Sequence, residues 1–152
     1  MTPASFACVV DASVAAQLYV PEPLTPQALA LFGLLARGNV VFHVPDLFYA
    51  ECANIFWKKV QRGVCTVAES TQALANILAL PLTSTPARNL AADALILANA
   101  HSVSCYDGCY VALAQRVGAS LITADQKLEQ RLAPAGLPIS WLGSWTPPQP
   151  TP

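Results

Sequence analysis

Four of the nine carboxylates in the sequence stand where apolar segments end or helical segments begin. Asp11 directly follows one apolar run of the strand type, and Asp125 shortly follows another. Asp107 opens a helical segment, and Glu51 lies early in a different one. Because parallel strands end at one edge of a sheet, their loops and the adjoining helix N-termini share a crevice. We expect the three aspartates to line that crevice.

Glu51 reaches the same crevice if the segment 46–62 is a helix. With 3.6 residues per turn, one stripe of that helix carries Leu47, Glu51, Asn54, Ile55 and Lys58. The neighbouring residues are mostly apolar or aromatic, and an unpaired carboxylate among them would be costly. This cost favours a ligand-binding role for Glu51.

Four carboxylates in one pocket would repel one another and titrate upward unless a cation neutralised them. Mg²⁺ and Mn²⁺ are the natural cations, since they prefer oxygen ligands and keep several water molecules. Such an ion can activate water against a phosphodiester and shield the charge of the scissile phosphate. The acidic set therefore predicts a divalent-metal site for phosphoryl chemistry.

A structural role is the alternative for two of the acids. Asp107 and Asp125 are both good helix N-caps, and Thr123 with Gln126 has the pattern of a capping box. Asp11 is harder to explain in this way, because an acid at the end of an apolar strand has no obvious capping duty. The crevice rule for α/β sheets favours function at Asp11.

Short apolar runs alternate with segments of helical spacing, which predicts an α/β layered domain. Four glycines fall where helices should stop and predict left-handed C-terminal residues: Gly38, Gly63, Gly118 and Gly136. We expect one domain over residues 1–145 and a proline-rich tail over 146–152. The expected strands are 6–10, 40–44, 120–123 and 139–142, and the expected helices are 26–37, 46–62, 67–80, 87–102, 107–117 and 125–132.

The composition indicates a folded core and a surface that is partly covered by another protein chain. The chain has 152 residues, of which 54% are hydrophobic and 11% charged, so it can bury a substantial core and is not disordered. The charged fraction is less than half the usual ~25%, which predicts an oligomer or a protein partner that covers part of the surface.

No export signal is indicated, and Pro81 with several Ser and Thr residues interrupts the charge-free segment 70–87. We expect a cytoplasmic protein with no membrane span and with five reduced cysteines acting mainly as buried small hydrophobes.

The net charge of -1 argues against RNA binding, because RNA phosphates normally bind Lys and Arg. Without the four site acids, however, eight basic residues face five acidic ones. Lys58, Lys59 and Arg62 form the one basic cluster, and the remaining basic residues are scattered along the chain. A solvated helix face explains such a cluster as well as RNA does, so Lys58 is a candidate RNA contact with that alternative open.

Four segments taken together resemble the PIN-domain family, and within it the VapC-type ribonuclease toxins of bacterial toxin–antitoxin pairs. They are VVDASV at 9–14, YAECAN at 49–54, YDGCYVALA at 106–114 and LITADQKL at 121–128. The resemblance implies a three-layer α/β/α sandwich with a short, mainly parallel central sheet. It also implies an endoribonuclease dependent on Mg²⁺ or Mn²⁺, a homodimer, and inhibition by a small cognate antitoxin protein.

Carried over position by position, the resemblance makes four acids the catalytic metal ligands: Asp11, Glu51, Asp107 and Asp125. It places Ser13, Asn54 and Thr123 beside them as supporting or phosphate-contacting groups. Gly108 stands where the family usually has alanine, which would loosen the helical turn behind Asp107.

Two other functional classes remain as alternatives. One is a catalytically silent PIN-like module that binds RNA or a protein and keeps the acids for folding. The other is a phosphatase or phosphoacceptor domain, which also places acids at strand ends. Haloacid-dehalogenase phosphatases carry a DxD motif, whereas this chain has Asp11-Ala12-Ser13, and this difference argues against the second class.

Overall fold

The centre of the molecule is a five-stranded parallel sheet, which the computed structural model describes with its helices over residues 6–149. The strand order is β3-β2-β1-β4-β5, and each neighbouring pair runs parallel. The strands are β1 (Phe6–Val10), β2 (Val40–Pro45), β3 (Thr83–Thr85), β4 (Ser120–Thr123) and β5 (Ile139–Trp141). The four predicted strands are confirmed to within one residue at each end.

β1 occupies the middle of the sheet, and Val9 and Val10 on it have no exposed area. A parallel sheet covered on both faces has this uniformly apolar centre, which is why the apolar runs identified its strands. β3 was not predicted. It consists of three residues, Thr-Ser-Thr, on the edge of the sheet, and so offers no apolar run to detect.

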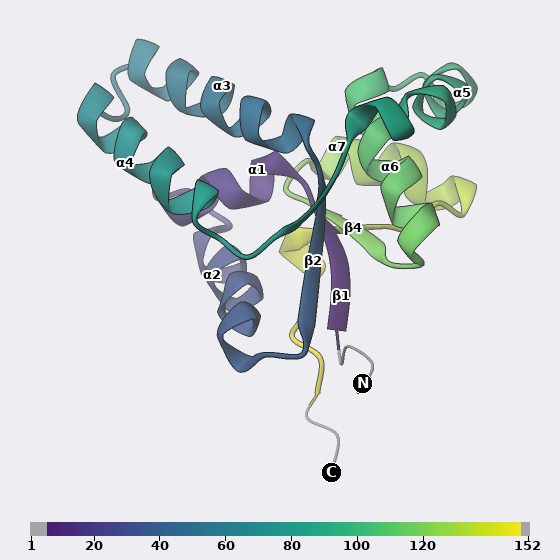
Figure 1. Ribbon diagram of the computed structural model, residues 1–152, viewed down its shortest axis with the longest axis horizontal. Helices are drawn as coiled ribbons and strands as arrows, with labels where there is room; N and C mark the ends of the chain where they lie inside the picture. Colours follow the sequence, from purple (N-terminus) through teal and green to yellow (C-terminus); the bar gives the residue numbers. More distant parts are fainter. Residues whose placement is uncertain (1–5, 150–152) are drawn as a thin grey trace.

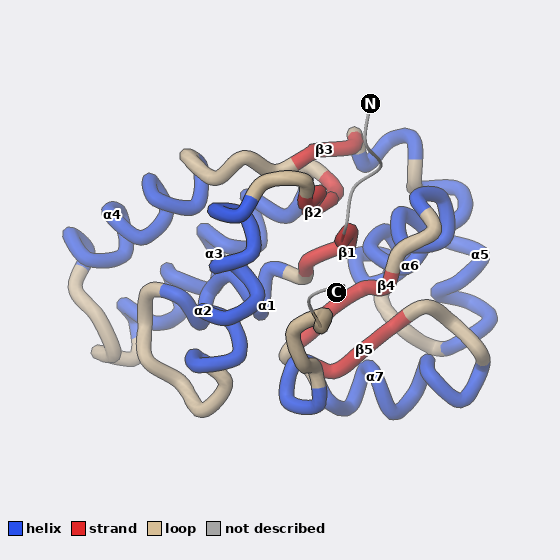
Figure 2. The backbone as a smooth tube through the Cα atoms, turned by 90° about the horizontal axis from the view of Figure 1, so that it is seen from below, coloured by secondary structure: helices blue, strands red, loops and turns tan. Residues whose placement is uncertain are grey.

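Helices cover both faces of the sheet in three layers (Figure 1). One face carries the helices before β3, and the other carries the helices after it, as the view from below also shows (Figure 2). The first group is α1 (Ala12–Ala15), α2 (Thr25–Gly33), α3 (Leu47–Gln61) and α4 (Val67–Leu78). The second group is α5 (Ala91–His101), α6 (Cys105–Val117) and α7 (Gln126–Leu132). The expected α/β/α sandwich is confirmed.

The helix boundaries differ from the predictions in a few places. Four-residue α1 was missed because it is too short to show periodicity. A 3-10 turn ends the predicted segment 26–37, and another begins the predicted segment 87–102. All four predicted C-terminal glycines do have positive φ, as expected from their places after helices.

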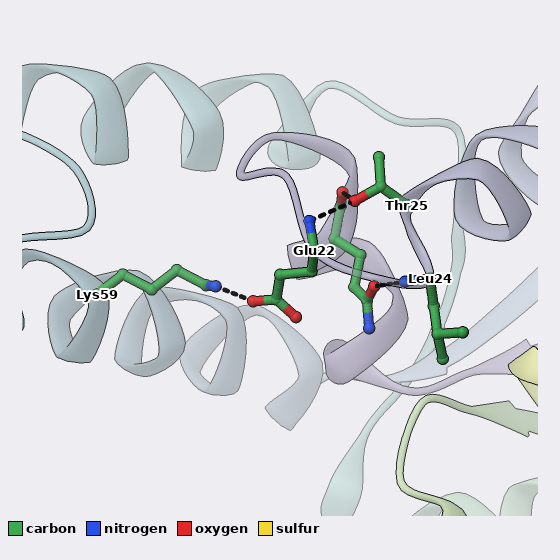
Figure 3. Close-up of polar contacts among 5 residues, drawn as sticks. Glu22, Leu24, Thr25 and Lys59 are labelled. Carbon is green, nitrogen blue, oxygen red and sulfur yellow. Dashed lines mark hydrogen bonds and ion pairs between the residues drawn. The ribbon is translucent and has the colours of Figure 1, made fainter.

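The loop before α2 is tied to α3 by a small polar network (Figure 3). Lys59 on α3 forms an ion pair with Glu22, whose backbone N–H donates to the Thr25 hydroxyl at 2.8 Å. The Thr25 hydroxyl donates to the backbone carbonyl of Gln17 at 2.8 Å, and the Gln17 side chain accepts from the Leu24 N–H at 3.1 Å. The Lys59–Glu22 ion pair therefore links α3 to the segment between α1 and α2.

The cysteines are all unpaired, and three of them, Cys8, Cys52 and Cys109, are buried as expected. Cys105 is exposed, so the buried interpretation is wrong for that residue. Within residues 6–149, none of the helices combines the length and the apolar character needed to cross a bilayer.

Candidate active site

Asp11 lies where the order of the sheet reverses. From β1 the chain moves outward to β2 and β3, then crosses back and continues through β4 and β5 on the other side. The connections leaving β1 and β4 therefore diverge, which opens a crevice at the carboxyl ends of these two strands. The Asp11 N–H still donates to the carbonyl of Ile122 on β4, at 3.0 Å, so Asp11 is the last residue tied to the sheet.

Two hydroxyl groups hold the Asp11 carboxylate. Thr123 Oγ1 donates to Asp11 Oδ2 at 2.7 Å, and Ser13 Oγ donates to the same oxygen at 2.9 Å. The Thr123 hydroxyl accepts from the Asp125 N–H at 3.0 Å, and the Ser13 hydroxyl accepts from the Ala124 N–H at 3.1 Å. These bonds lock the end of β1 to the turn after β4. Ser13 and Thr123 thus lie beside Asp11, as the resemblance implied.

Asp125 and Asp107 enter the crevice from two helices. Asp125 is the N-cap of α7, and its Oδ1 accepts from the Leu128 N–H at 3.1 Å, so its capping role is real. Asp107 is not a cap. α6 begins two residues before it, and the cap is Ser104, whose Oγ accepts from the Asp107 N–H at 3.0 Å. The capping box predicted for Thr123 and Gln126 is also wrong, because the N-cap of α7 is Asp125.

Glu51 is held from the opposite helical layer. The Tyr110 hydroxyl on α6 donates to Glu51 Oε1 at 2.7 Å, and the Tyr110 side chain is 1% exposed. Burial raises the pKa of Tyr110, so the phenol stays protonated and remains a donor. Sequence reasoning missed this residue. Its position three residues after Asp107 was the available signal, since that spacing places both on neighbouring faces of one helix.

The stripe predicted on α3 lines a hollow of about 450 Å³ beside these acids. Asn54 and Lys58 thereby lie in the same hollow as Glu51. Tyr106, which sequence reasoning also passed over, completes the wall from α6 and is 67% exposed. The whole lining is Leu47, Ala50, Glu51, Asn54, Ile55, Lys58 and Tyr106.

A second, more polar hollow of about 250 Å³ contains the other two acids. Asp107 and Asp125 share its walls with Lys127 and Arg131 of α7. These two cations are among the basic residues that are scattered along the sequence, and the fold brings them to the same hollow. The whole lining is Ser102, Val103, Ser104, Asp107, Asp125, Lys127, Leu128 and Arg131.

The electrostatics of the crevice disfavour bare carboxylates. The pKa of Glu51 is raised to about 7, chiefly by burial; the Tyr110 hydrogen bond lowers it, and the negative charges of Asp11 and Asp107 contribute to the rise. Burial is also the largest cause of the raised pKa of Asp11, with Asp125 adding repulsion. The pKa of Asp107 is raised by burial and then by Asp11 and Asp125. The predicted repulsion is present, but desolvation is the stronger cause.

The donor set fits a hard divalent cation. All four carboxylates are oxygen ligands, and their mutual effects on pKa place them within electrostatic reach of one another. Over residues 6–149 the ion pairs are Lys59–Glu22 and Arg116–Asp93, so none neutralises the four acids. In the same range no three His, Cys, Asp or Glu side chains already surround one ion position.

Comparison with known proteins gives consistent matches. The family model described as "PIN domain" matches residues 8–131. Ribonuclease VapC3 from Pyrobaculum aerophilum is 36% identical over 127 residues, which is 81% of this chain and 92% of that protein.

Two solved structures share the fold. The Mycobacterium tuberculosis VapC20, a sarcin-ricin loop cleaving toxin, superposes with a TM-score of 0.63 at 19% identity, covering 88% of this chain and 96% of that one. VapBC2 from Rickettsia felis, bound to a DNA fragment from their promoter, superposes with a TM-score of 0.60 at 13% identity. The match covers 89% of this chain and 98% of that one. At these identities the structures establish a common architecture.

Proposed function

This chain belongs to the PIN-domain family, and from that premise we propose that it is a metal-dependent endoribonuclease and the toxin of a toxin–antitoxin pair. The observation that carries the proposal is the set of four acids at the switch point of the sheet with no ion-pair partner among residues 6–149. Carboxylates gathered in that state favour a cation, since Asp11 is buried and Glu51 and Asp107 are half-buried, and their oxygen atoms suit Mg²⁺ or Mn²⁺. The ribonuclease name of the Pyrobaculum relative supports RNA as the substrate.

Asp11, Glu51, Asp107 and Asp125 would hold the ion. When bound, a divalent cation shields the charge of the scissile phosphate and makes water a better nucleophile. Ser13 and Thr123 fix the direction of the Asp11 carboxylate, which limits the reorganisation needed when a ligand enters.

On the α3 side, Tyr110 orients Glu51. Asn54 and Lys58 line the adjoining hollow, where an amide and an ammonium group can donate to RNA phosphate oxygens.

The partners and the setting follow from the same premise. The Rickettsia structure is of a VapBC pair, which supports a small cognate antitoxin for this chain. Exposed apolar side chains on α5, Leu95 and Ile96, support a homodimer through that helix. Five unpaired cysteines are consistent with a reducing cytoplasm. We propose residues 1–145 as the nuclease domain and 146–152 as a tail, of which 1–5 and 150–152 lie outside the described residues.

The test is RNA cleavage with a matched inactive protein. Purified protein is incubated with a pool of transfer RNA and structured RNA in Mg²⁺, Mn²⁺ or EDTA, and Asp107→Asn is purified in the same way to reveal contaminating nuclease. We expect discrete products that require metal and disappear with the variant. Equal cleavage by both proteins would contradict the mechanism. Absence of both cleavage and Mn²⁺ binding would favour the catalytically silent module.

A further inference from the structure

Two cations of α7 stand beside the acids without neutralising them. Lys127 and Arg131 are four residues apart, which places them on one face of the helix, and both line the hollow that contains Asp107 and Asp125. The ion pairs within residues 6–149 lie elsewhere, at Glu22 and Asp93. Both cationic side chains are exposed. They are therefore available to an anion that approaches the acidic centre.

Arg131 is held in place at the rim of this hollow. Its Nη1 atom donates to the backbone carbonyl of Ser102 at 2.7 Å, which ties α7 to the turn between α5 and α6. This bond uses one of the five guanidinium N–H groups, so the others can still donate. A guanidinium fixed in this way has already lost much of the side-chain freedom that binding would cost.

The second hollow shares no lining residue with the first. The acids thus have cationic groups on two sides, Lys58 beside Glu51 and the α7 pair beside Asp107 and Asp125. An RNA strand has a phosphate on each side of the one being cleaved, so such a strand can use both sides at once. A single small anion would need only one of them.

We propose that Lys127 and Arg131 form a phosphate-binding subsite that holds the RNA backbone next to the scissile phosphate. The strand passes from the hollow of α3, past the acids, to α7. This assignment rests on the proposed ribonuclease function and adds the direction in which the substrate crosses the site. An acidic protein segment is the less favourable occupant, because it would bring further carboxylates beside Asp107 and Asp125.

The experiment measures binding as a function of salt. A fluorescent, mixed-sequence 2′-O-methyl RNA of about twelve nucleotides is titrated in Mg²⁺ at about 0.05 to 0.2 M salt, and its integrity is checked on a gel. The double variant Lys127→Ala/Arg131→Ala should lower the slope of log K against log salt by about 1.4, the value for two phosphate contacts on a single strand. At about 0.1 M salt this corresponds to roughly twentyfold weaker binding.

Two further variants separate binding from folding. Arg116→Ala removes the same kind of charge from the far end of α6, where Arg116 pairs with Asp93, and should leave the slope unchanged. Arg131→Lys loses the planar guanidinium that can contact Ser102 and a phosphate together, but it keeps the positive charge. Because the slope of log K against log salt depends on that charge, most of the slope should remain. Thermal melting of every variant checks the fold.

The outcomes distinguish this subsite from the function on which it rests. If the wild-type protein neither binds nor cleaves RNA, both the proposed function and the proposed subsite are contradicted. A double variant that melts normally and matches wild-type affinity and slope, while wild-type protein cleaves RNA, would overturn the subsite alone. Loss of antitoxin binding with unchanged RNA binding would assign the two cations to the protein partner and overturn the proposal.

Discussion

The hydroxyl of Tyr110 donates a 2.7 Å hydrogen bond to Oε1 of Glu51. The two residues belong to α6 and α3, on opposite faces of the sheet. One helix therefore provides both Asp107 and the group that orients Glu51, and a shift of α6 would displace two acids together. Tyr110 is a positioning residue, since it acts on the site through Glu51.

Replacing Tyr110 by phenylalanine tests this relationship. The ring and its packing remain, so we expect only a small loss of stability, of the order of one net hydrogen bond, ~1 kcal/mol. Mn²⁺ affinity measured by calorimetry should fall by about tenfold, as for other groups that orient a metal ligand. Tyr49→Phe, on α3 beside Phe48, is the matched control. Wild-type Mn²⁺ affinity in Tyr110→Phe would contradict the positioning role.

Thr123 gives a prediction about stability as well as binding. Its side chain has no exposed area, and its hydroxyl links Asp11 to the Asp125 N–H. Thr123→Val leaves the Asp125 N–H unsatisfied and removes one of the two hydroxyl donors to Asp11, and we expect a loss of about 1–3 kcal/mol in the free energy of unfolding. Thr123→Ser keeps the hydroxyl and should retain Mn²⁺ binding. Equal stability of the two variants in urea would show that the hydroxyl does not hold the crevice together.

The metal-free protein should become less stable as the pH rises. Burial raises the pKa of Glu51 to about 7, above its value of ~4.3 in an unfolded chain. Between these values the folded protein binds more protons than the unfolded one, so the free energy of unfolding decreases with rising pH. The raised pKa values of Asp11 and Asp107 act in the same direction.

Urea denaturation in EDTA across this range of pH measures the effect. Glu51→Gln should weaken the dependence of the unfolding free energy on pH. Glu129→Gln, which removes a carboxylate of α7, should leave that dependence as it is in the wild type. A wild-type protein whose stability rises through the same window would contradict the burial of these acids.

Gly108 is required by helix packing. A Cβ atom at this position would lie 2.6 Å from the backbone carbonyl oxygen of Ala94 on α5, so α5 and α6 would have to separate. The expectation that glycine merely loosens this turn is therefore incomplete, because here glycine permits the close approach.

We predict that Gly108→Ala costs about 1–3 kcal/mol in unfolding free energy and weakens Mn²⁺ binding by displacing Asp107. Gly33→Ala is the matched change, since a Cβ there would meet no atom within 4 Å, and it should stabilise by about 0.5–1 kcal/mol. Chemical denaturation of both variants gives the comparison. Equal effects of the two substitutions would refute the packing argument.

The sequence by itself determined the elements that local chemistry governs. Buried parallel strands are continuous apolar runs, so β1, β2 and β4 could be located from hydropathy, whereas the polar edge strand β3 could not. Helical spacing placed Glu51, Asn54 and Lys58 on one stripe, and the structure confirms that they share a hollow. These features depend on residues a few positions apart, which is the range over which a pattern can be read.

Only the tertiary structure decided which groups meet across the sheet. The hydroxyl of Thr123 reaches Asp11 because β4 pairs with β1, although these residues are far apart in the chain. Tyr110 reaches Glu51, and Lys127 and Arg131 join Asp107, because the strand order reverses at β1 and brings helices of both layers to one edge of the sheet. Strand order is set by the packing of the whole core, and no local spacing encodes it. For the same reason burial, which depends on the complete fold, outweighs charge repulsion in raising the pKa values of the acids.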